Sequence, residues 1–180
     1  MTAFAFKNED LPHYTINEWK MWDGKWELIK GIPYAMSPMA NRKHQFISGK
    51  IITELNLKLD CNDCSVYPPI DWQINEDTIL EPDVSIVCGE WKGHYLTYPP
   101  ELIFEILSPS TALKDKNLKF QIYQSQKVKF YIIINPVNEK AEVYQLEEEY
   151  YVNKGEFAHE HFLCEWNDCK LNFDFSKIWK

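Results

Sequence analysis

The longest regular pattern in the chain is an amphipathic one between residues 40 and 59. Its apolar positions recur at helical spacing and are Phe46, Ile47, Ile51, Leu55 and Leu59. Such spacing predicts a helix with one face on a hydrophobic core. A shorter helix is predicted over 15–22, because Thr15 and Glu18 fit a capping box and Asp23-Gly24 ends it.

Apolar runs between turn residues predict a series of strands. The expected strands are 25–29, 32–36, 65–67, 70–74, 82–88, 102–107 and 128–134, with a turn at Lys30-Gly31. The run LIFEIL at 102–107 is apolar enough for a central strand that is covered on both faces.

A second helix is predicted over 111–126, capped by residues 108–111, with Leu118 and Ile122 as its buried stripe. The last third alternates apolar and polar residues over 141–146, 150–153, 157–163 and 171–173, as antiparallel strands do. The fold class is therefore α/β, with a mixed β-sheet flanked by helices and additional antiparallel strands. At 180 residues, we expect one domain over 1–180.

Composition places the chain among cytoplasmic globular proteins. The chain has no run of 18 apolar residues, so a membrane span is not expected. Its first residues lack a basic segment followed by an apolar one, so a secretory signal is not expected either. The 5 Cys are an odd number in a chain large enough to fold without disulfides, which favours free thiols. Cys61 and Cys64 have the spacing of a zinc-binding pair. Cys164 and Cys169, near His159 and His161, could supply the other half of such a ligand set. We favour free thiols because a second C-x-x-C is absent.

The net charge is −8, and Arg42 is the single arginine. This balance weighs against a protein that coats nucleic acid through a basic surface. It does not exclude a nuclease, whose site is itself acidic until a metal arrives.

Two acids stand within apolar strand patterns. Glu105 lies inside LIFEIL, and Asp83 follows Pro82 at the start of DVSIV. Because an ionised carboxylate in an apolar strand is costly unless it is compensated, each is a candidate functional or paired acid. Two carboxylates on neighbouring strands with a lysine nearby form a site for Mg²⁺, which prefers hard oxygen ligands.

These residues resemble the Uma2 family of restriction-endonuclease-like proteins (DUF820). The resemblance rests on Pro82-Asp83, the run EILSPST, the helix KDKNLKFQIYQ and the strand FYIIINP. WELIKG, MSP at residues 36–38 and His44 fit the same plan, over roughly 14–146. It implies the PD-(D/E)xK nuclease superfamily, a mixed sheet flanked by helices, and Mg²⁺- or Mn²⁺-dependent cleavage of DNA.

Carried over by position, the resemblance makes Asp83 and Glu105 metal ligands, with the backbone carbonyl of Ile106 as a third. Glu27 matches the upstream acid that completes such sites, as a catalytic residue or a ligand. Leu107 stands where the superfamily has lysine, two residues after the second acid. Lys119 is our candidate for the missing ammonium.

Lys119 shares a helix face with Asp115 and Tyr123, since the three are spaced four apart. His44 and Tyr123 are weaker site candidates. Each assignment has a structural alternative: a turn carboxylate for Asp83, a buried ion pair for Glu105, solvated side chains for Glu27 and Lys119, and a local hydrogen bond for His44. Most of the seven Trp are expected in core packing rather than in base stacking.

The sequence thus predicts a metal-dependent endonuclease that hydrolyses DNA phosphodiester bonds. The alternative is a catalytically inactive nuclease-like module that binds nucleic acid or protein, because Leu107 replaces the usual lysine. A hydrolase that uses paired carboxylates on sugars is a third hypothesis. A homodimer is expected from the resemblance alone, since cutting both strands requires two sites.

Overall fold

A six-stranded sheet forms the centre of the protein. The structure is a computed structural model and describes residues 11–36, 41–108 and 112–179. The strands are β3 (Cys64–Tyr67), β6 (Val84–Cys88), β7 (Leu102–Ile106), β8 (Phe130–Asn135), β9 (Lys140–Glu147) and β10 (Tyr150–Phe157), in the order β10-β9-β8-β7-β6-β3. Strands β7 and β8 are parallel and the other neighbours are antiparallel, so the predicted mixed sheet is confirmed.

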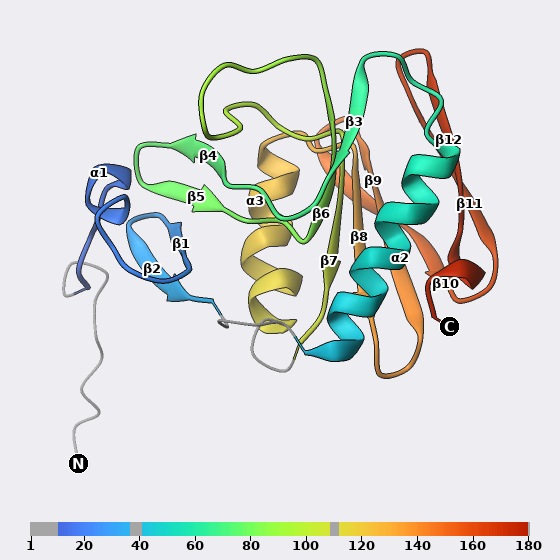
Figure 1. The fold of residues 1–180 in the computed structure, drawn as a ribbon, viewed down its shortest axis with the longest axis horizontal. Helices are drawn as coiled ribbons and strands as arrows, with labels where there is room; N and C mark the ends of the chain where they lie inside the picture. The colour runs from blue at the N-terminus through green and yellow to red at the C-terminus, as the bar shows by residue number, and fades with distance from the viewer. Residues whose placement is uncertain (1–10, 37–40, 109–111, 180) are drawn as a thin grey trace.

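Helices cover both faces of this sheet (Figure 1). On one face, α2 (Arg42–Lys58) packs Ile47, Ile51 and Leu55 into a core that includes Phe104. On the other face lie the π-helical turn η2 (Lys114–Lys119) and α3 (Phe120–Ser125), whose Tyr123 belongs to a second apolar cluster. All five residues of β7 are buried, as expected for a central strand.

A smaller sheet lies beside the first. It consists of β2 (Ile32–Ala35), β1 (Trp26–Ile29), β5 (Thr78–Leu80) and β4 (Trp72–Asn75), in that order, with α1 (Ile16–Trp19) packed on β1 through the third apolar cluster. The capping box predicted at Thr15 is present. Lys30 and Gly31 both have positive φ, as a two-residue hairpin turn of type I′ requires. Strand β5 was not predicted.

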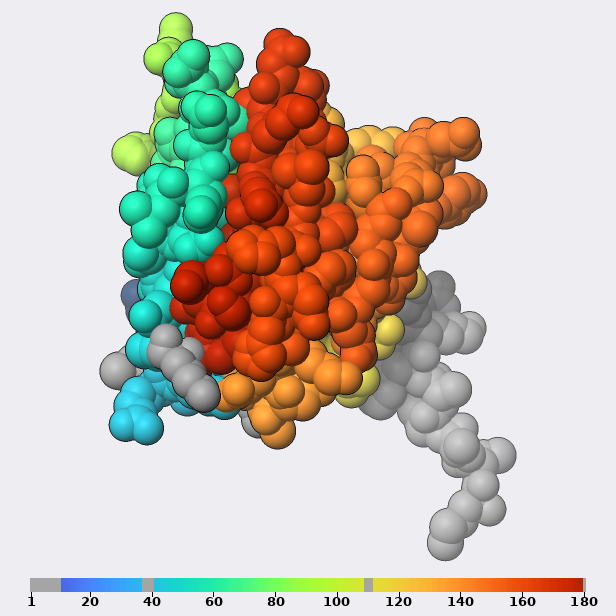
Figure 2. Space-filling view, turned by 90° about the vertical axis from the view of Figure 1, so that its right-hand side faces the viewer, coloured from blue at the N-terminus to red at the C-terminus, as the bar shows by residue number. Residues whose placement is uncertain are grey.

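The chain ends in a hairpin of β11 (His161–Trp166) and β12 (Cys169–Asp174), followed by the 3₁₀ turn η3 (Phe175–Lys177). Figure 2 shows this hairpin against α2 on one face of the molecule. Phe173 and Phe175 pack into the α2 side of the core, where Phe173 contacts Phe104. The hairpin thereby completes the core rather than extending either of the larger sheets.

Three local predictions are wrong. The side chain of Phe46 is 45% exposed, so it does not belong to the buried face of α2. Leu118 is 37% exposed, because the face turned to the sheet carries Asp115, Lys119 and Tyr123 instead. The strand expected over 157–163 is divided, since β10 ends at Phe157 and β11 begins at His161.

The cysteines also differ from expectation. Disulfides join Cys61 to Cys169 and Cys64 to Cys88, so the predicted free thiol is found only at Cys164. Among the residues considered for the second half of a zinc site, Cys169 meets Cys61 and Cys64, whereas Cys164, His159 and His161 are not in this cluster. Within the described ranges, no helix is both long and apolar enough to cross a membrane. The Ser-Pro turn after Met36 and the cap at 109–111 lie outside the described residues.

Leu55 and Leu57, both in α2, test how the helix contributes to stability. Leu55 is fully buried, whereas Leu57 is 74% exposed. We expect Leu55→Ala to lower the free energy of unfolding by about 2–5 kcal/mol, because it leaves a cavity in the core. Leu57→Ala is the matched control and should change that energy by no more than about 0.5 kcal/mol. Urea denaturation followed by circular dichroism measures both; equal effects would contradict this packing.

Candidate active site

Glu105 lies at the centre of the candidate site, on the central strand β7. Its side chain lies on the same sheet face as Ile103, under α3, and is almost fully buried. The Oε1 atom accepts a hydrogen bond from the Tyr123 hydroxyl at 2.6 Å and one from Lys119 Nζ at 2.8 Å. Burial, together with the charges of neighbouring carboxylates, raises the pKa of Glu105 well above its ordinary value, although Lys119 opposes this shift.

Lys119 is held among three carboxylates. Its Nζ lies 2.8 Å from Glu27 Oε1, 2.8 Å from Glu105 Oε1 and 3.9 Å from Asp115 Oδ1. Burial alone would lower the pKa of Lys119, but these carboxylates outweigh it and raise the pKa well above its ordinary value. The side chain is therefore a buried ammonium, and the solvated-helix alternative for Lys119 is wrong.

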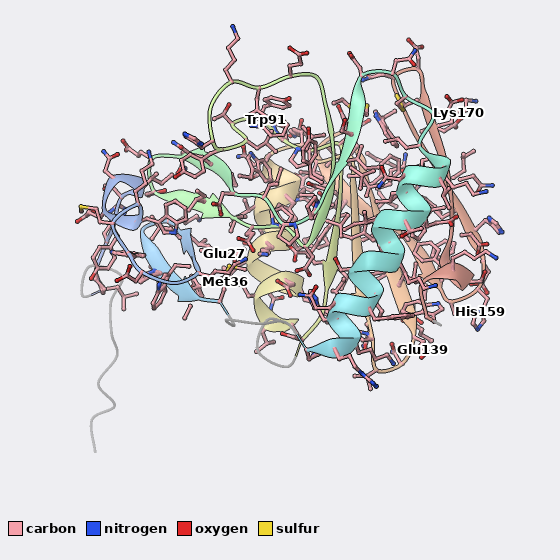
Figure 3. The ribbon with its side chains drawn as sticks, viewed as in Figure 1. Glu27, Met36, Trp91, Glu139, His159 and Lys170 are labelled. Carbon is pink, nitrogen blue, oxygen red and sulfur yellow. A yellow bond between two sulfur atoms is a disulfide. The ribbon has the colours of Figure 1, made fainter. Side chains whose placement is uncertain are left out.

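Glu27 reaches this ammonium from β1 in the smaller sheet. Figure 3 shows it between the β1–β2 hairpin and α3. Its Oε1 also accepts the backbone N–H of Glu81 at 3.0 Å, and its Oε2 pairs with Lys114 Nζ. Burial raises the pKa of Glu27, but the charges of Lys119 and Lys114 overcome this and leave it below the ordinary value. The half-exposed alternative for Glu27 is also wrong.

Asp83 lies directly before β6, across from Glu105. Because Val84 pairs with Phe104 in the antiparallel register, the next residues along, Asp83 and Glu105, are opposite one another. Asp83 Oδ2 accepts the backbone N–H of Ile106 at 2.7 Å and is 3.1 Å from His44 Nε2. The site therefore spans the ends of two neighbouring strands.

His44 comes from the first turn of α2, where its backbone N–H is capped by the Asn41 side chain at 2.9 Å. Burial lowers the pKa of His44, but the hydrogen bond and charge of Asp83 overcome this and raise it. The sequence-based alternative, a local helix hydrogen bond, does not describe this ring, since its partner is 39 residues away.

Sequence reasoning missed Lys114 as a site residue. In a regular α-helix, Lys114 would not share a face with Lys119, but η2 is π-helical and its residues i and i+5 come together. Both lysines therefore reach Glu27. Tyr131 on β8 supports the turn by donating its hydroxyl to the Asp115 carbonyl at 3.0 Å. No spacing in the sequence signals a π-turn.

The donor set suits a hard divalent cation. The carboxylates of Glu27, Glu105 and Asp115 surround Lys119, and Glu27 also pairs with Lys114. The fourth carboxylate, that of Asp83, lies opposite Glu105 and pairs with His44. Burial is the main reason that the pKa of Glu105 is raised, and the neighbouring carboxylates add to this shift. All hydrogen bonds among the described residues to Asp83 fall on Oδ2, and those to Glu105 fall on Oε1. Each acid thus has a second oxygen with which it would hold Mg²⁺ or Mn²⁺.

The structure brings all the predicted site residues into one network: Asp83, Glu105, Lys119, Glu27, His44, Tyr123 and the main chain of Ile106. Lys119, from the turn that precedes α3, supplies the ammonium group beside Glu105. The side chain of Leu107 instead packs in the apolar cluster under α3.

Comparison with known proteins identifies a family and a solved structure of similar fold. Residues 14–165 match the Uma2 family, described as "Putative restriction endonuclease". An uncharacterized protein of Synechocystis, slr1290, is 28% identical over 144 residues, covering 74% of this chain and 75% of its own. The crystal structure of "a putative nuclease belonging to DUF820" from Anabaena variabilis superposes with a TM-score of 0.73 at 16% identity, over 92% of this chain and 97% of that one. The family match covers most of the chain, which therefore belongs to the Uma2 family of restriction-endonuclease-like proteins.

Proposed function

We propose that this protein is a metal-dependent endonuclease that hydrolyses DNA phosphodiester bonds. The supporting observation is the meeting of Asp83, Glu105 and the Lys119 ammonium at the ends of neighbouring strands in a mixed sheet. This is the acid, acid and lysine combination of PD-(D/E)xK nucleases, with the lysine delivered from the following helix. The family description supports the same reaction class.

Asp83 and Glu105 would hold Mg²⁺ or Mn²⁺, with the Ile106 carbonyl as a further oxygen ligand. When bound, the ion supplies charge that stabilises the phosphodiester during in-line attack. Glu27 already accepts donors at both oxygens, so we assign it to positioning Lys119 and to the metal only through water. Glu27 therefore acts mainly by positioning Lys119.

Lys119 has its pKa raised, so it is protonated at neutral pH and acts as a donor. In that state it orients the attacking water and offsets developing negative charge, rather than removing a proton. His44, which lies 3.1 Å from Asp83 Oδ2, is placed to hydrogen-bond a phosphate oxygen or to fix the orientation of Asp83. Arg42 and Lys43 precede it at the exposed start of α2 and offer positive charge to the DNA backbone.

Asp83→Asn and Glu105→Gln test the metal ligands. Each change keeps the shape of the side chain but removes the charge of the carboxylate. We therefore expect the rate of Mg²⁺- or Mn²⁺-dependent cleavage to fall about 10³-fold, which corresponds to a loss of several kcal/mol of transition-state stabilisation. Glu156→Gln, an exposed acid on β10 paired with Lys140, is the control and should cleave normally. Cleavage of supercoiled plasmid and of single-stranded DNA at low salt is the assay. Full activity in either site variant would refute the proposal.

Lys119→Met tests the relocated ammonium, with Lys116→Met as its control. Lys116 lies in the same turn but is 41% exposed and pairs only with Glu142 among the described residues. We expect Lys119→Met to lose cleavage and to lower the free energy of unfolding by about 3–5 kcal/mol, because Glu27 and Glu105 lose their cation. Activity is compared below the unfolding transition of each variant. A folded Lys119→Met enzyme that still cleaves would remove Lys119 from the mechanism.

Tyr123→Phe leaves every charge in place and removes only the hydroxyl bound to Glu105. Because a hydrogen bond to a charged group contributes about 1.5–3 kcal/mol, we expect more metal to be required for half-maximal cleavage. Tyr150→Phe, at a 71% exposed ring on β10, is the matched control. An unchanged metal dependence in Tyr123→Phe would show that Tyr123 does not support the ligand.

Cleavage of both DNA strands requires two such sites, and we propose that they come from a homodimer. Light scattering should then give twice the 21.4 kDa mass of the chain; a monomer at the working concentration would exclude it. If the wild-type protein cleaves no substrate and binds no Mg²⁺ or Mn²⁺ by calorimetry, the inactive nuclease-like binding module becomes the better description.

A further inference from the structure

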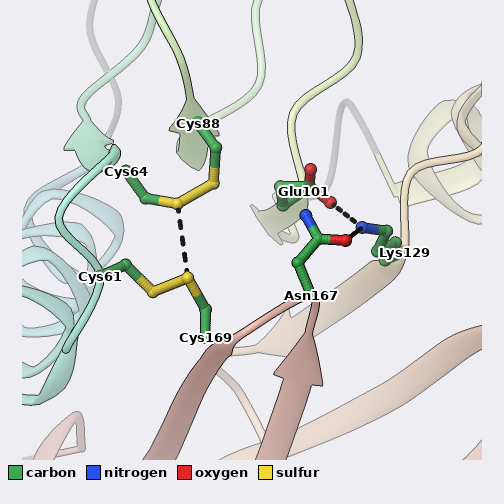
Figure 4. The surroundings of a disulfide bond; sticks show 7 residues. All are labelled: Cys61, Cys64, Cys88, Glu101, Lys129, Asn167 and Cys169. Atoms are coloured by element: carbon green, nitrogen blue, oxygen red, sulfur yellow. Dashed lines mark hydrogen bonds and ion pairs between the residues drawn. A yellow bond between two sulfur atoms is a disulfide. The ribbon is translucent and has the colours of Figure 1, made fainter.

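Four of the five cysteines gather at one place, remote in sequence from one another. Cys61 follows α2, Cys64 begins β3, Cys88 ends β6 and Cys169 begins β12. Figure 4 shows the four side chains converging, with Cys61 joined to Cys169 and Cys64 to Cys88. All four are half-buried against the core on the α2 side.

The two pairs are close enough to form a single cluster. Cys64 Sγ lies 3.9 Å from Cys169 Sγ, and the sulfur atoms of Cys61, Cys64 and Cys169 are all within 4.8 Å of one another. Tetrahedral zinc with Zn–S bonds of about 2.3 Å has sulfur-to-sulfur edges of about 3.8 Å. The separation of Cys64 and Cys169 is therefore already that of neighbouring ligands in one zinc site, and Cys88 joins the cluster through its bond to Cys64.

We propose that the reduced chain binds one Zn²⁺ through the thiolates of Cys61, Cys64, Cys88 and Cys169. The ligand set is complete with four sulfur atoms, which is the composition of a closed, structural zinc site. Cys61 and Cys64 supply the C-x-x-C half. Cys88 and Cys169 supply the other half, and they come from strands that only the folded chain brings together.

The local backbone also fits such a site. Cys64 and Cys88 are paired residues of the antiparallel strands β3 and β6, and Gly89 N–H donates to the Asp63 carbonyl at 2.7 Å. Gly89 has φ near +84°, so the chain turns directly after Cys88. A bridge pair between Asp60 and Lys170 holds the segments of Cys61 and Cys169 side by side. Three chain segments are thus already fixed around the sulfur atoms.

When the reduced chain binds one Zn²⁺, the four cysteine thiols release four protons, and this step needs no oxidant or reductant. The two disulfides and the zinc site are alternative states of the same four side chains, so zinc requires all four to be reduced. Soft thiolates prefer Zn²⁺ to the hard Mg²⁺ of the proposed catalytic site. The two metals would therefore not compete.

The cluster lies far from the candidate active site. Cys88 ends β6 whereas Asp83 precedes its first residue, so the strand separates them by about 16 Å at 3.3 Å per residue. Zinc at the cluster would link the end of α2, the edge of the six-stranded sheet and the β11–β12 hairpin. Its role is structural and does not depend on nuclease activity.

Cobalt is the probe that tests this proposal, because Co²⁺ in a tetrahedral thiolate site has intense charge-transfer and ligand-field absorption. The full chain, purified under reductant and freed of metal anaerobically, is titrated with Co²⁺ and then with Zn²⁺. We expect one Co²⁺ per chain with the thiolate spectrum, displaced by one Zn²⁺, and a higher Tm with zinc than without. Asp83→Asn should give the same spectrum, which separates this site from carboxylate binding.

Matched alanine variants assign the ligands. Cys64→Ala and Cys169→Ala should lose the tetrathiolate spectrum, whereas Cys164→Ala, at the free buried cysteine outside the cluster, should keep it. Should the ligand variants fail to fold, X-ray absorption of the zinc-loaded wild type decides, with four sulfur neighbours expected at about 2.3 Å. A reduced wild type that takes up no Co²⁺ or Zn²⁺ with sulfur ligation, or a folded Cys64→Ala with the wild-type spectrum, would overturn the proposal and leave two disulfides.

Discussion

The Lys119 ammonium, buried between Glu27 and Glu105, is the interaction on which the arrangement of the site depends. Glu27 comes from the smaller sheet, Glu105 from the larger sheet and Lys119 from the turn that precedes α3. Three elements are thereby fixed relative to one another by one charged group. Because a buried ion pair has a large desolvation cost, it adds little net stability. Removing one of its charged partners destabilises the protein far more than replacing all of them with apolar residues of similar volume.

The network has a dry inner part and a wetter outer part. The side chains of Glu27, Glu105 and Lys119 are 1–3% exposed, whereas those of Asp83 and His44 are 18% and 14% exposed. Electrostatic interactions are stronger in the inner part, where water is excluded. The more exposed side of the network is formed by Asp83, His44 and the start of α2. The inner part holds its charges in place before any substrate arrives, which is the condition for electrostatic catalysis.

The same sheet carries two contrasting clusters at opposite ends of β6. At one end lie the carboxylates and lysines of the candidate site; at the other, four cysteines form two disulfides. The strand itself is buried and apolar between them. Strand β6 therefore separates the cluster of carboxylates and lysines from the cluster of cysteines.

The sequence by itself determined the main architecture, because apolar periodicity is a local property. The amphipathic pattern of 40–59 and the LIFEIL strand became the expected elements, with ends shifted by a few residues. The alternating tail became antiparallel strands, although the strand expected over 157–163 is divided between β10 and β11. The acids Asp83 and Glu105 were also visible, since charges within apolar strands are rare without a partner or a function. Glu27 was identified only through the resemblance to the Uma2 family.

Tertiary structure alone decided how these residues meet. The apolar residues Leu118 and Ile122 suggested one buried face for the second helix, but the sheet below presents Glu105, so the face with Asp115, Lys119 and Tyr123 turns inward to compensate that charge. The π-turn that adds Lys114 has no sequence signature. The cysteines likewise appeared unpaired because Cys88 and Cys169 are distant in sequence from Cys61 and Cys64. The local sequence pattern shows which residues are apolar and which elements they form. The pairing of charges and of sulfur atoms depends on contacts between distant residues, which only the folded chain creates.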